Sequence, residues 1–514
     1  MPTASRFRTG YSILSIPNFS GGWNPRDAWG EVEDTELIDV LNFTLDKKGS
    51  LLKRLGLTRV NASDQIVNTG NVQILYYSAA TDRMLAQVGA DLYASSDGGV
   101  NWGASIKTFT TSARVGMVDF LDKVVIIHPV DTAFTYDGTT FSSAVANAPP
   151  GNAIAVWQNA LWSVGDPSNP SRVTRSDLGA LTWPASPVTN DVRVKDDAAL
   201  TAIGGGEGMD TEGRAGLLVF KENSTYRIHS LTDGAYTVVD FNYGASGPLS
   251  VTTNNGMTGA ISRRGIIVMR GDASVPVLAS HKIEPLFHPT QLTYASSGDM
   301  AAGNHEDRML FSLPWDSSTT NNLTLEYHPS YEWIVPHSFG CTSLTTYSKD
   351  TRKTYGGKVG SGASTYGYIL DLFSGGSDDG AAIACRAQTK WFEPNGGSDV
   401  RYRRGVVNGR GTFNLYIRLN YDSGQGEGFP IAIEGMGMTW GSGLWGVDTW
   451  GTNVQQDYQE IFSLGFGRSI SFAMEETSSL TKTTTPFLGD GASETVGAVA
   501  LHGLTVDMVT LGRS

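Results

Sequence analysis

The chain has 514 residues and a formal net charge of −13, and this length suggests roughly two to four domains. Glycine is abundant (61 residues) and only 17% of the residues are charged, which excludes a helix-rich protein, because helices favour Ala, Leu, Glu, Lys and Gln. The 12 Trp, 19 Tyr and 20 Phe exclude a disordered chain, and the acidic balance argues against a protein that grips nucleic acid through its phosphates.

The N-terminal segment, residues 1–65, is set off by turn and glycine signals and is predicted to be an arm outside the main domains. It lacks the apolar core of a signal peptide, and no run in the chain approaches the ~18 apolar residues of a membrane span. We therefore expect a soluble chain without an export signal of its own or a membrane span. Residues 34–45 (DTELIDVLNFTL) are the one stretch whose pattern indicates a short helix.

Strand signals dominate residues 66–385. Hairpins recur at the ~8–12-residue spacing of sandwiches, barrels and propellers, and hairpin pairs return about every 40–50 residues, the length of a four-stranded blade. The sequence therefore predicts an all-β protein with a β-propeller in this region. The runs that carry the prediction are residues 71–78, 82–89, 123–130, 153–164, 216–230, 264–271, 307–315 and 322–329.

Residues 95–102 (SSDGGVNW) match the Asp-box, the S-x-D-x-G-x-x-W pattern of propeller hairpins. The serine and aspartate can bond backbone N–H groups of the turn, the glycine can take a positive φ, and the tryptophan can fold under the turn and bury its ring. A shortened copy runs from Ser176 to Trp183. An Asp-box holds no catalytic group, so we interpret both copies as structural. The residues of the first copy are Ser95, Asp97, Gly99 and Trp102.

The blade-like hairpins stop before the last part of the chain, and residues 386–514 are predicted to form a C-terminal β-domain, a barrel or a sandwich. Alternation along a strand would place Arg401 and Arg403 on one face and Arg404 on the other. We interpret this cluster as a solvated face, with pairing between subunits and a nucleic-acid patch as alternatives. The full cluster is Arg401, Arg403, Arg404 and Arg410.

Residues that could carry chemistry form no recognisable active site. The eight histidines lack metal-ligand spacing, and neither a P-loop nor a nucleophile elbow occurs. We therefore predict no catalytic residue, no metal site and no cofactor. Cys341 and Cys385 are expected to be two buried thiols, with a single bridge between them as the alternative.

Two other functions are alternatives for a β-propeller chain of this kind. A glycosidase like the sialidases, which are six-bladed Asp-box propellers, needs three arginines on a carboxylate, a Tyr/Glu pair and an Asp acid, and no spacing here selects such a set. A glycan-binding module could stack sugars on Trp440, Trp445 and Trp450. A spacing of five alternates between the faces of a strand, so packing inside the C-terminal domain is the favoured interpretation.

A pattern near the N-terminus carries a family resemblance. Residues 21–27 read GGWNPRD, Asn42 follows an acidic stretch, and residues 49–56 read GSLLKRLG. With these segments in this order, the chain resembles the tail nozzle proteins (tail tubular protein B) of short-tailed bacteriophages, although Leu55 stands where many relatives carry Pro. Further matching stretches are residues 159–183, 217–228, 259–271 and 281–287.

The resemblance implies a structural virion protein of a bacteriophage tail, not an enzyme. Its copies would form the nozzle ring, a hexamer, which closes the DNA channel and lets the genome pass during ejection without binding it specifically. The implied partners are further copies of the chain, the adaptor or head-to-tail connector, and tail fibres or spikes.

The same pattern supplies candidate docking residues. Its glycines allow close backbone approach, and Lys53 and Arg54 offer charge to an acidic neighbour such as the adaptor, with a solvated turn as the alternative. A long loop would gate the channel, and the Gly-rich residues 204–208 are a candidate, with a solvated outer loop as the alternative. The docking candidates are Gly21, Gly22, Asn24, Asn42, Lys53, Arg54 and Gly56.

Overall fold

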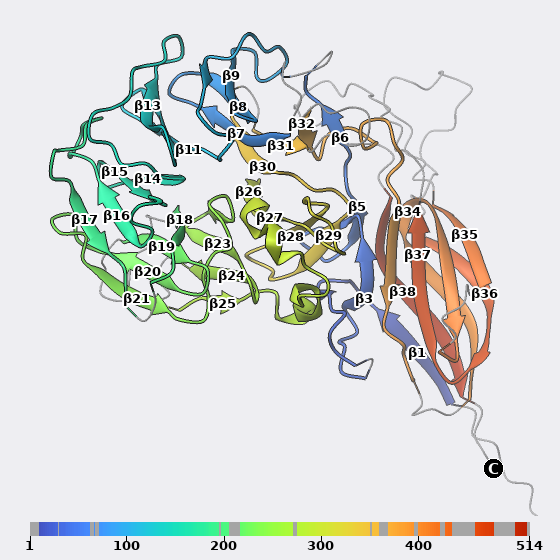
Figure 1. The fold of residues 1–514 in the computed structure, drawn as a ribbon. Coiled ribbons are helices and arrows are strands. Elements are labelled where there is room, and N and C mark those ends of the chain that lie inside the picture. Colours follow the sequence, from blue (N-terminus) through green and yellow to red (C-terminus); the bar gives the residue numbers. More distant parts are fainter. Residues whose placement is uncertain are drawn as a thin grey trace, which may run out of the picture. The chain divides into compact units, whose positions relative to one another are not determined.

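The chain divides into two compact units in the computed structural model (Figure 1). Unit 1 comprises Met1–Gly56, Trp333–Pro336 and Gly375–Ser514, and unit 2 comprises Leu57–Glu332 and His337–Ser374. The residues that the structure describes are 10–28, 30–61, 66, 71–194, 197–204, 216–270, 275–349, 352–358, 368–394, 399–421, 427–433, 458–476 and 499–510.

Nearly all regular structure in these residues is β, which confirms the predicted all-β class. The described helices are two short 3-10 segments, η1 (His281–Phe287) and η2 (Tyr294–Asp299). Neither has the length or the apolar character that crossing a membrane requires.

Unit 2 is a seven-bladed β-propeller. Its described residues form seven antiparallel sheets in chain order, and the first strand of each contacts the first strand of the next until β30 meets β7 and closes the ring. Figure 1 shows these sheets around a common centre. The seven first strands are β7 (Val72–Ser78), β11 (Gly116–Phe120), β14 (Ala153–Trp157), β18 (Leu200–Gly204), β22 (Val251–Asn254), β26 (Ala301–His305) and β30 (Ser343–Tyr347).

The second strands are almost completely buried, because neighbouring blades cover both of their faces. They are β8 (Arg83–Val88), β12 (Lys123–His128), β15 (Ala160–Val164), β19 (Leu217–Lys221), β23 (Met257–Ser262), β27 (Arg308–Leu313) and β31 (Lys353–Lys358). The third strands are β9 (Asp91–Ser95), β13 (Thr132–Tyr136), β16 (Arg172–Arg175), β20 (Thr225–Ile228), β24 (Gly265–Arg270), β28 (Leu323–Tyr327) and β32 (Tyr368–Leu372). Fourth strands are β10 (Lys107–Thr108), β17 (Val188–Asp191), β21 (Tyr236–Asp240) and β25 (Val277–Leu278). Strand β29 (Ile334–His337) follows β28 in its sheet, although residues 334–336 are assigned to unit 1.

The last blade takes its outer strand from the other end of the propeller sequence. Strand β6 (Leu57–Arg59) pairs antiparallel with β32, with Leu57 opposite Leu372. The Arg59 guanidinium lies 3.9 Å from the centre of the Tyr368 ring, which adds a cation–π contact to the closure. The propeller therefore begins at residue 57, before the predicted boundary at 66.

Unit 1 joins both ends of the chain in one 11-stranded sheet. The prediction of an N-terminal arm is wrong, because five N-terminal strands belong to this sheet: β1 (Gly10–Ile16), β2 (Gly22–Trp23), β3 (Glu36–Leu41), β4 (Phe43–Leu45) and β5 (Leu51–Lys53). Its other strands are β33 (Cys385–Thr389), β34 (Val400–Leu419), β35 (Glu427–Ile433), β36 (Tyr458–Gly467), β37 (Ile470–Glu476) and β38 (Ala500–Thr510). Residues 386–514 are thus not a separate domain.

Pairing also explains why the predicted helix at residues 34–45 is wrong. Strand β3 pairs with β33, and β4 pairs with β5, so tertiary hydrogen bonds decide the conformation of this segment. Asn42 separates the two strands with a φ of +60°, a conformation that asparagine tolerates better than most residues.

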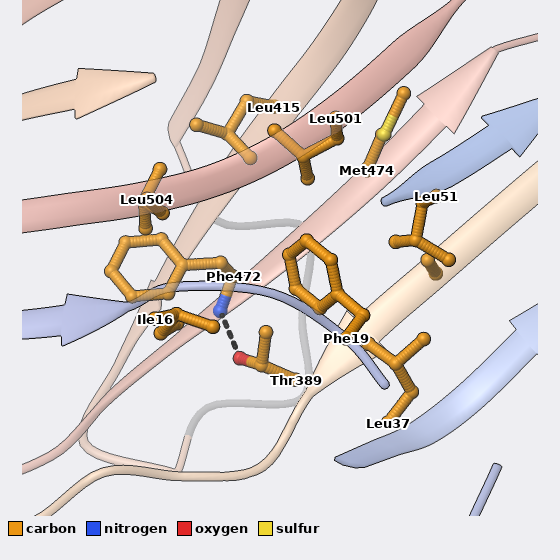
Figure 2. A pocket seen from close by; sticks show the side chains of 11 residues that line it. Ile16, Phe19, Leu37, Leu51, Thr389, Leu415, Phe472, Met474, Leu501 and Leu504 are labelled. Carbon is orange, nitrogen blue, oxygen red and sulfur yellow. Dashed lines mark hydrogen bonds between the residues drawn. The ribbon is translucent and has the colours of Figure 1, made fainter. Parts of the chain in front are cut away.

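The core of unit 1 is built by side chains from both ends of the chain. Figure 2 shows Phe19 and Leu37 beside Phe472 and Leu501, around a void of about 10 Å³. Phe19 and Leu37 are each 1% exposed, so the N-terminal segment supplies central core residues. Its removal would expose this core.

We predict that Leu57→Ala weakens the propeller by about 2–5 kcal/mol, because Leu57 is buried in the closing strand and its truncation leaves a cavity. Leu178→Ala is the control, since Leu178 is 55% exposed and its loss should cost no more than about 0.5 kcal/mol. The unfolding free energy in urea measures both, and equal effects would contradict the role of β6.

Candidate functional site

Lys53 and Arg54 lie inside unit 1. Both side chains have 0% exposure: Lys53 Nζ donates to Glu476 Oε2 on β37, and Arg54 makes a bidentate pair with Asp378, at 2.8 and 2.5 Å. The prediction that these two charges face an acidic partner is wrong, as is the solvated turn, because carboxylates of the same unit take both charges. A buried cation is retained only where such a partner compensates it.

Asn42 links this ion network to the backbone. Its Oδ1 accepts from Arg54 Nε at 2.9 Å, and its Nδ2 donates to the carbonyl of Ala384 at 2.7 Å. Its side chain is thereby fixed between the N-terminal strands and the segment before β33. Asn42 therefore has a structural role within unit 1.

The remaining members of the N-terminal pattern are also buried or tightly packed. Asn24 Nδ2 donates to Asp27 at 2.9 Å and to Glu36 at 2.8 Å. A Cβ at Gly21 would lie 2.4 Å from Glu36, and one at Gly56 would lie 2.1 Å from the Ser377 carbonyl oxygen. The glycines thus allow close approach, as predicted, but the approach is to the same chain. Gly22 has a φ of +71° at the Gly-Gly turn.

The basic cluster on β34 departs from simple alternation. Tyr402 pairs with Met508 and Arg404 with Asp507, so two residues of β34 span one step of β38. This bulge puts Arg404 on the same face as Arg401, which corrects the predicted split. Tyr402 is buried, whereas Arg401, Arg403 and Arg404 are exposed. Arg404 pairs with Glu460 at 2.7 Å within the subunit.

The first Asp-box forms the predicted turn in unit 2, whereas in the second copy Ser176 Oγ accepts from Leu161 N on β15 and Asp177 accepts from the Thr182 hydroxyl. In the first, Ser95 Oγ accepts from Gly99 N at 3.0 Å, Asp97 accepts from Asn101 N at 3.0 Å, and Trp102 Nε1 donates to the Gly99 carbonyl at 2.9 Å. Gly99 has a φ of +93°. The Trp102 ring is only half-buried, contrary to expectation, whereas Trp183 in the second copy is 2% exposed.

The centre of the propeller is an uncharged cavity of about 360 Å³ lined by the seven first strands or the residues beside them. Polar lining groups bond neighbouring blades: Ser343 Oγ accepts from Leu75 N at 3.0 Å, and Thr252 donates to Asn304 at 2.8 Å. None of the lining residues carries a charge, and the hydroxyl and amide groups chiefly hold the ring together.

The two cysteines are poor candidates for a nucleophile. Cys341 and Cys385 are both free and buried, as predicted, and burial raises each thiol pKa to about 12. Such thiols stay protonated at neutral pH and are poor nucleophiles. Among the described residues, no three His, Cys, Asp or Glu side chains come together as a metal site.

Two sequence-based candidates lie outside the described residues. These are most of the predicted gate, from Gly205 to Gly208, and the three tryptophans Trp440, Trp445 and Trp450. Sequence reasoning missed the acidic partners of the ion network, Asp378 and Glu476, because they lie more than 300 residues from Arg54 and Lys53. The one signal in the sequence was that Lys53 and Arg54 are adjacent cations inside an apolar segment, which is a rare arrangement for surface charges.

Comparison with known proteins shows no matching family model and no matching curated protein. Solved structures that are similar include a "Mitotic Checkpoint Complex" chain (10% identity, TM-score 0.38, covering 62% of this chain and 94% of that one) and BBS1N in complex with ARL6DN (10%, 0.40, 62% and 98%). A third is the extracellular domain of a putative one-component system from B. thetaiotaomicron (10%, 0.42, 74% and 47%). The propeller assignment rests on the closed ring of seven sheets.

We predict that Glu476→Ala destabilises the protein by about 3–5 kcal/mol, because it removes the carboxylate from a buried ammonium group. Asp39→Ala is the matched control: it breaks the exposed Arg386–Asp39 pair and should cost about 0–1 kcal/mol. Urea unfolding compares the two, and a small effect at Glu476 would mean that Lys53 is not buried in solution.

His128 makes stability depend on pH in the acid range. Burial lowers the pKa of His128, whose Nδ1 accepts from the backbone N–H groups of Val130 and Asp131 at 3.1 and 3.0 Å. The unfolded chain therefore binds a proton more readily, so stability falls as pH drops below the unfolded value of about 6.5. His128→Asn keeps an acceptor but does not titrate, and it should flatten this part of a plot of unfolding free energy against pH. An unchanged slope would rule out His128 as the cause.

The tryptophans of the two Asp-boxes differ in burial and should differ in their contribution to stability. Trp183→Ala should cost about 3–5 kcal/mol, typical of a buried aromatic, because the ring is almost fully enclosed. Trp102→Ala should cost at least about 1 kcal/mol less than Trp183→Ala, since the Trp102 ring remains partly in water. The free energy of unfolding of the two variants, measured under the same conditions, tests this order. A larger loss for Trp102→Ala than for Trp183→Ala would contradict the prediction.

Proposed function

We propose that this chain is a structural protein of a short bacteriophage tail, whose copies form a nozzle ring around the path of the genome. The observation that carries the proposal is the role of the N-terminal pattern on which the family resemblance rests. Asn24, Asn42, Lys53 and Arg54 are all buried, and the last three bond to Ala384, Glu476 and Asp378 in the C-terminal part of unit 1. The residues of the pattern thus stabilise the fold of unit 1, a role that is compatible with a structural protein.

The propeller cavity does not serve as the DNA path in this proposal. Its volume of about 360 Å³ is that of a small-molecule pocket, far too small for a length of duplex. The genome would instead pass through the middle of a ring of copies. Head-to-tail interfaces form such rings when their rotation closes.

The charge of the chain suits a wall past which DNA slides. A basic wall would hold DNA through its phosphates and slow ejection. With a formal charge of −13 on each copy, repeated around the ring, the lumen is proposed to be acidic or neutral. The exposed arginines of β34 would then lie away from the lumen.

An electron-microscopy map of the virion tests the proposal. We expect the chain below the portal and adaptor, in a ring whose lumen is lined mainly by acidic or neutral side chains. Tails from a phage that lacks the gene are the control and should lose this density. A peripheral fibre position, or a lumen lined by Arg and Lys, would contradict the proposal.

A glycosidase assay separates this proposal from an Asp-box hydrolase. The propeller has seven blades, whereas sialidases have six, so the blade count does not favour that alternative. We expect no turnover of a fluorogenic sialoside by the purified chain. Turnover that is lost on substitution of a single Tyr or Glu would overturn the structural assignment.

A further inference from the structure

Part of the unit 1 sheet has two open sides. In this part the strand order is β36–β34–β38–β1, because β34 pairs with both β36 and β38, and β38 pairs with β1. No described strand pairs with the far side of β1 or of β36. Alternate backbone N–H and C=O groups of an edge strand point away from its neighbour and can bond another strand.

The other edges of the sheet carry the features by which proteins prevent strand addition, which are short length and proline. Strand β2 has two residues, and β4 has three residues that are all buried. Strand β35 contains Pro430, which cannot donate to a new ladder. Among the described strands, β1 and β36 have neither of these two features.

Strand β1 is an unprotected edge. Its sequence, GYSILSI, contains no charge and no proline, and all seven residues pair with β38 without a bulge. Ile13 is 66% exposed, an unusual position for a large aliphatic side chain in the middle of a strand. A long, regular and uncharged edge of this kind is suited to pairing with a further strand.

Strand β36 is the matching edge on the opposite side. It spans ten residues and pairs regularly with residues 405–408, before an irregularity in its register towards Phe466. Tyr458 is 43% exposed and Phe466 is 50% exposed. Its one charged residue, Glu460, is held by Arg404 on the neighbouring strand.

The exposed apolar groups of the two edges lie on the same face of the sheet. Ile13 is opposite Asp507, and Asp507 is opposite Arg404. Asn408 lies four residues after Arg404, hence on the same face, and is opposite Tyr458. A strand added at either edge would therefore find an apolar side chain on that face.

We propose that β1 of one copy pairs with β36 of the next, so that the sheet continues from copy to copy. The occupant is a second copy because one chain carries both of these long, proline-free edges, on opposite sides of the same four strands. Such an interface joins two different surfaces and can repeat, which gives a ring when the rotation closes. This inference rests on the proposed ring assembly and names the surfaces that would build it.

The test uses edge variants of the full chain. Ile13→Lys places a charge on β1, and Tyr458→Lys combined with Phe466→Lys places charges on β36; all three side chains are exposed, so folding should be retained and is checked by circular dichroism. Each variant alone should fall from the wild-type assembly to the 55.0-kDa monomer in analytical ultracentrifugation. Leu178→Lys, at an equally exposed leucine of the propeller, is the control and should leave the assembly unchanged.

Mixing the two edge variants gives the sharpest result. One retains an intact β36 and the other an intact β1, so the mixture should form a dimer of twice 55.0 kDa and nothing larger. A monomeric wild type, or variants that still assemble, would overturn this interface. Assembly of the β36 variant alone would indicate β1–β1 pairing and would also overturn it. The position of the chain in the virion is measured independently, so the tail function can stand if this interface fails.

Discussion

The segment before residue 60 closes both units of this protein, and the rest of the fold depends on these closures. In unit 1, β5 pairs with β38, and Phe19 and Leu37 complete the core. In unit 2, β6 completes the last blade. Both contacts join residues that are hundreds of positions apart, so each closes a long loop. The loop-closure entropy grows only slowly with length, and the buried apolar area offsets it.

The buried ion network gives the closure of unit 1 its specificity. Burial alone would allow β5 to slide along its neighbours, but Lys53 and Arg54 each require a particular carboxylate. A slip in register would leave a buried cation without compensation, at a cost of several kcal/mol. Asn42 adds a hydrogen bond that fits only one arrangement. The network therefore selects the register of β5 more than it adds to the stability of the sheet.

The propeller uses a different device to hold its ring. Its blades pack through apolar faces, which are non-directional, while side chains near the centre add directional bonds between neighbours. Gln87 donates to the Ala113 carbonyl at 2.7 Å and accepts from Val115 N at 3.1 Å. Where the last blade meets the first, Ser343 Oγ accepts a hydrogen bond from Leu75 N. Polar groups at the centre are thus structural, and the cavity between them carries no charge.

The sequence by itself determined the local structure. Alternating apolar runs and turn residues predicted the all-β class and most strands of the propeller, because these signals act over a few residues. The Asp-box at Ser95 and the two buried thiols were also predictable, since each depends on short-range geometry or on composition.

Only the tertiary structure decided which strands join. The N-terminal segment looks like an arm in the sequence because turn and glycine signals set it off, whereas most of its strands pair with β32, β33 and β38, at residues 368–510. Lys53 and Arg54 read as surface charges because nothing near them in the chain reveals Glu476 and Asp378. The face of Arg404 depends on a bulge that arises from pairing with β38. In each case the deciding contact spans about a hundred residues or more, so no local pattern of side chains could encode it visibly.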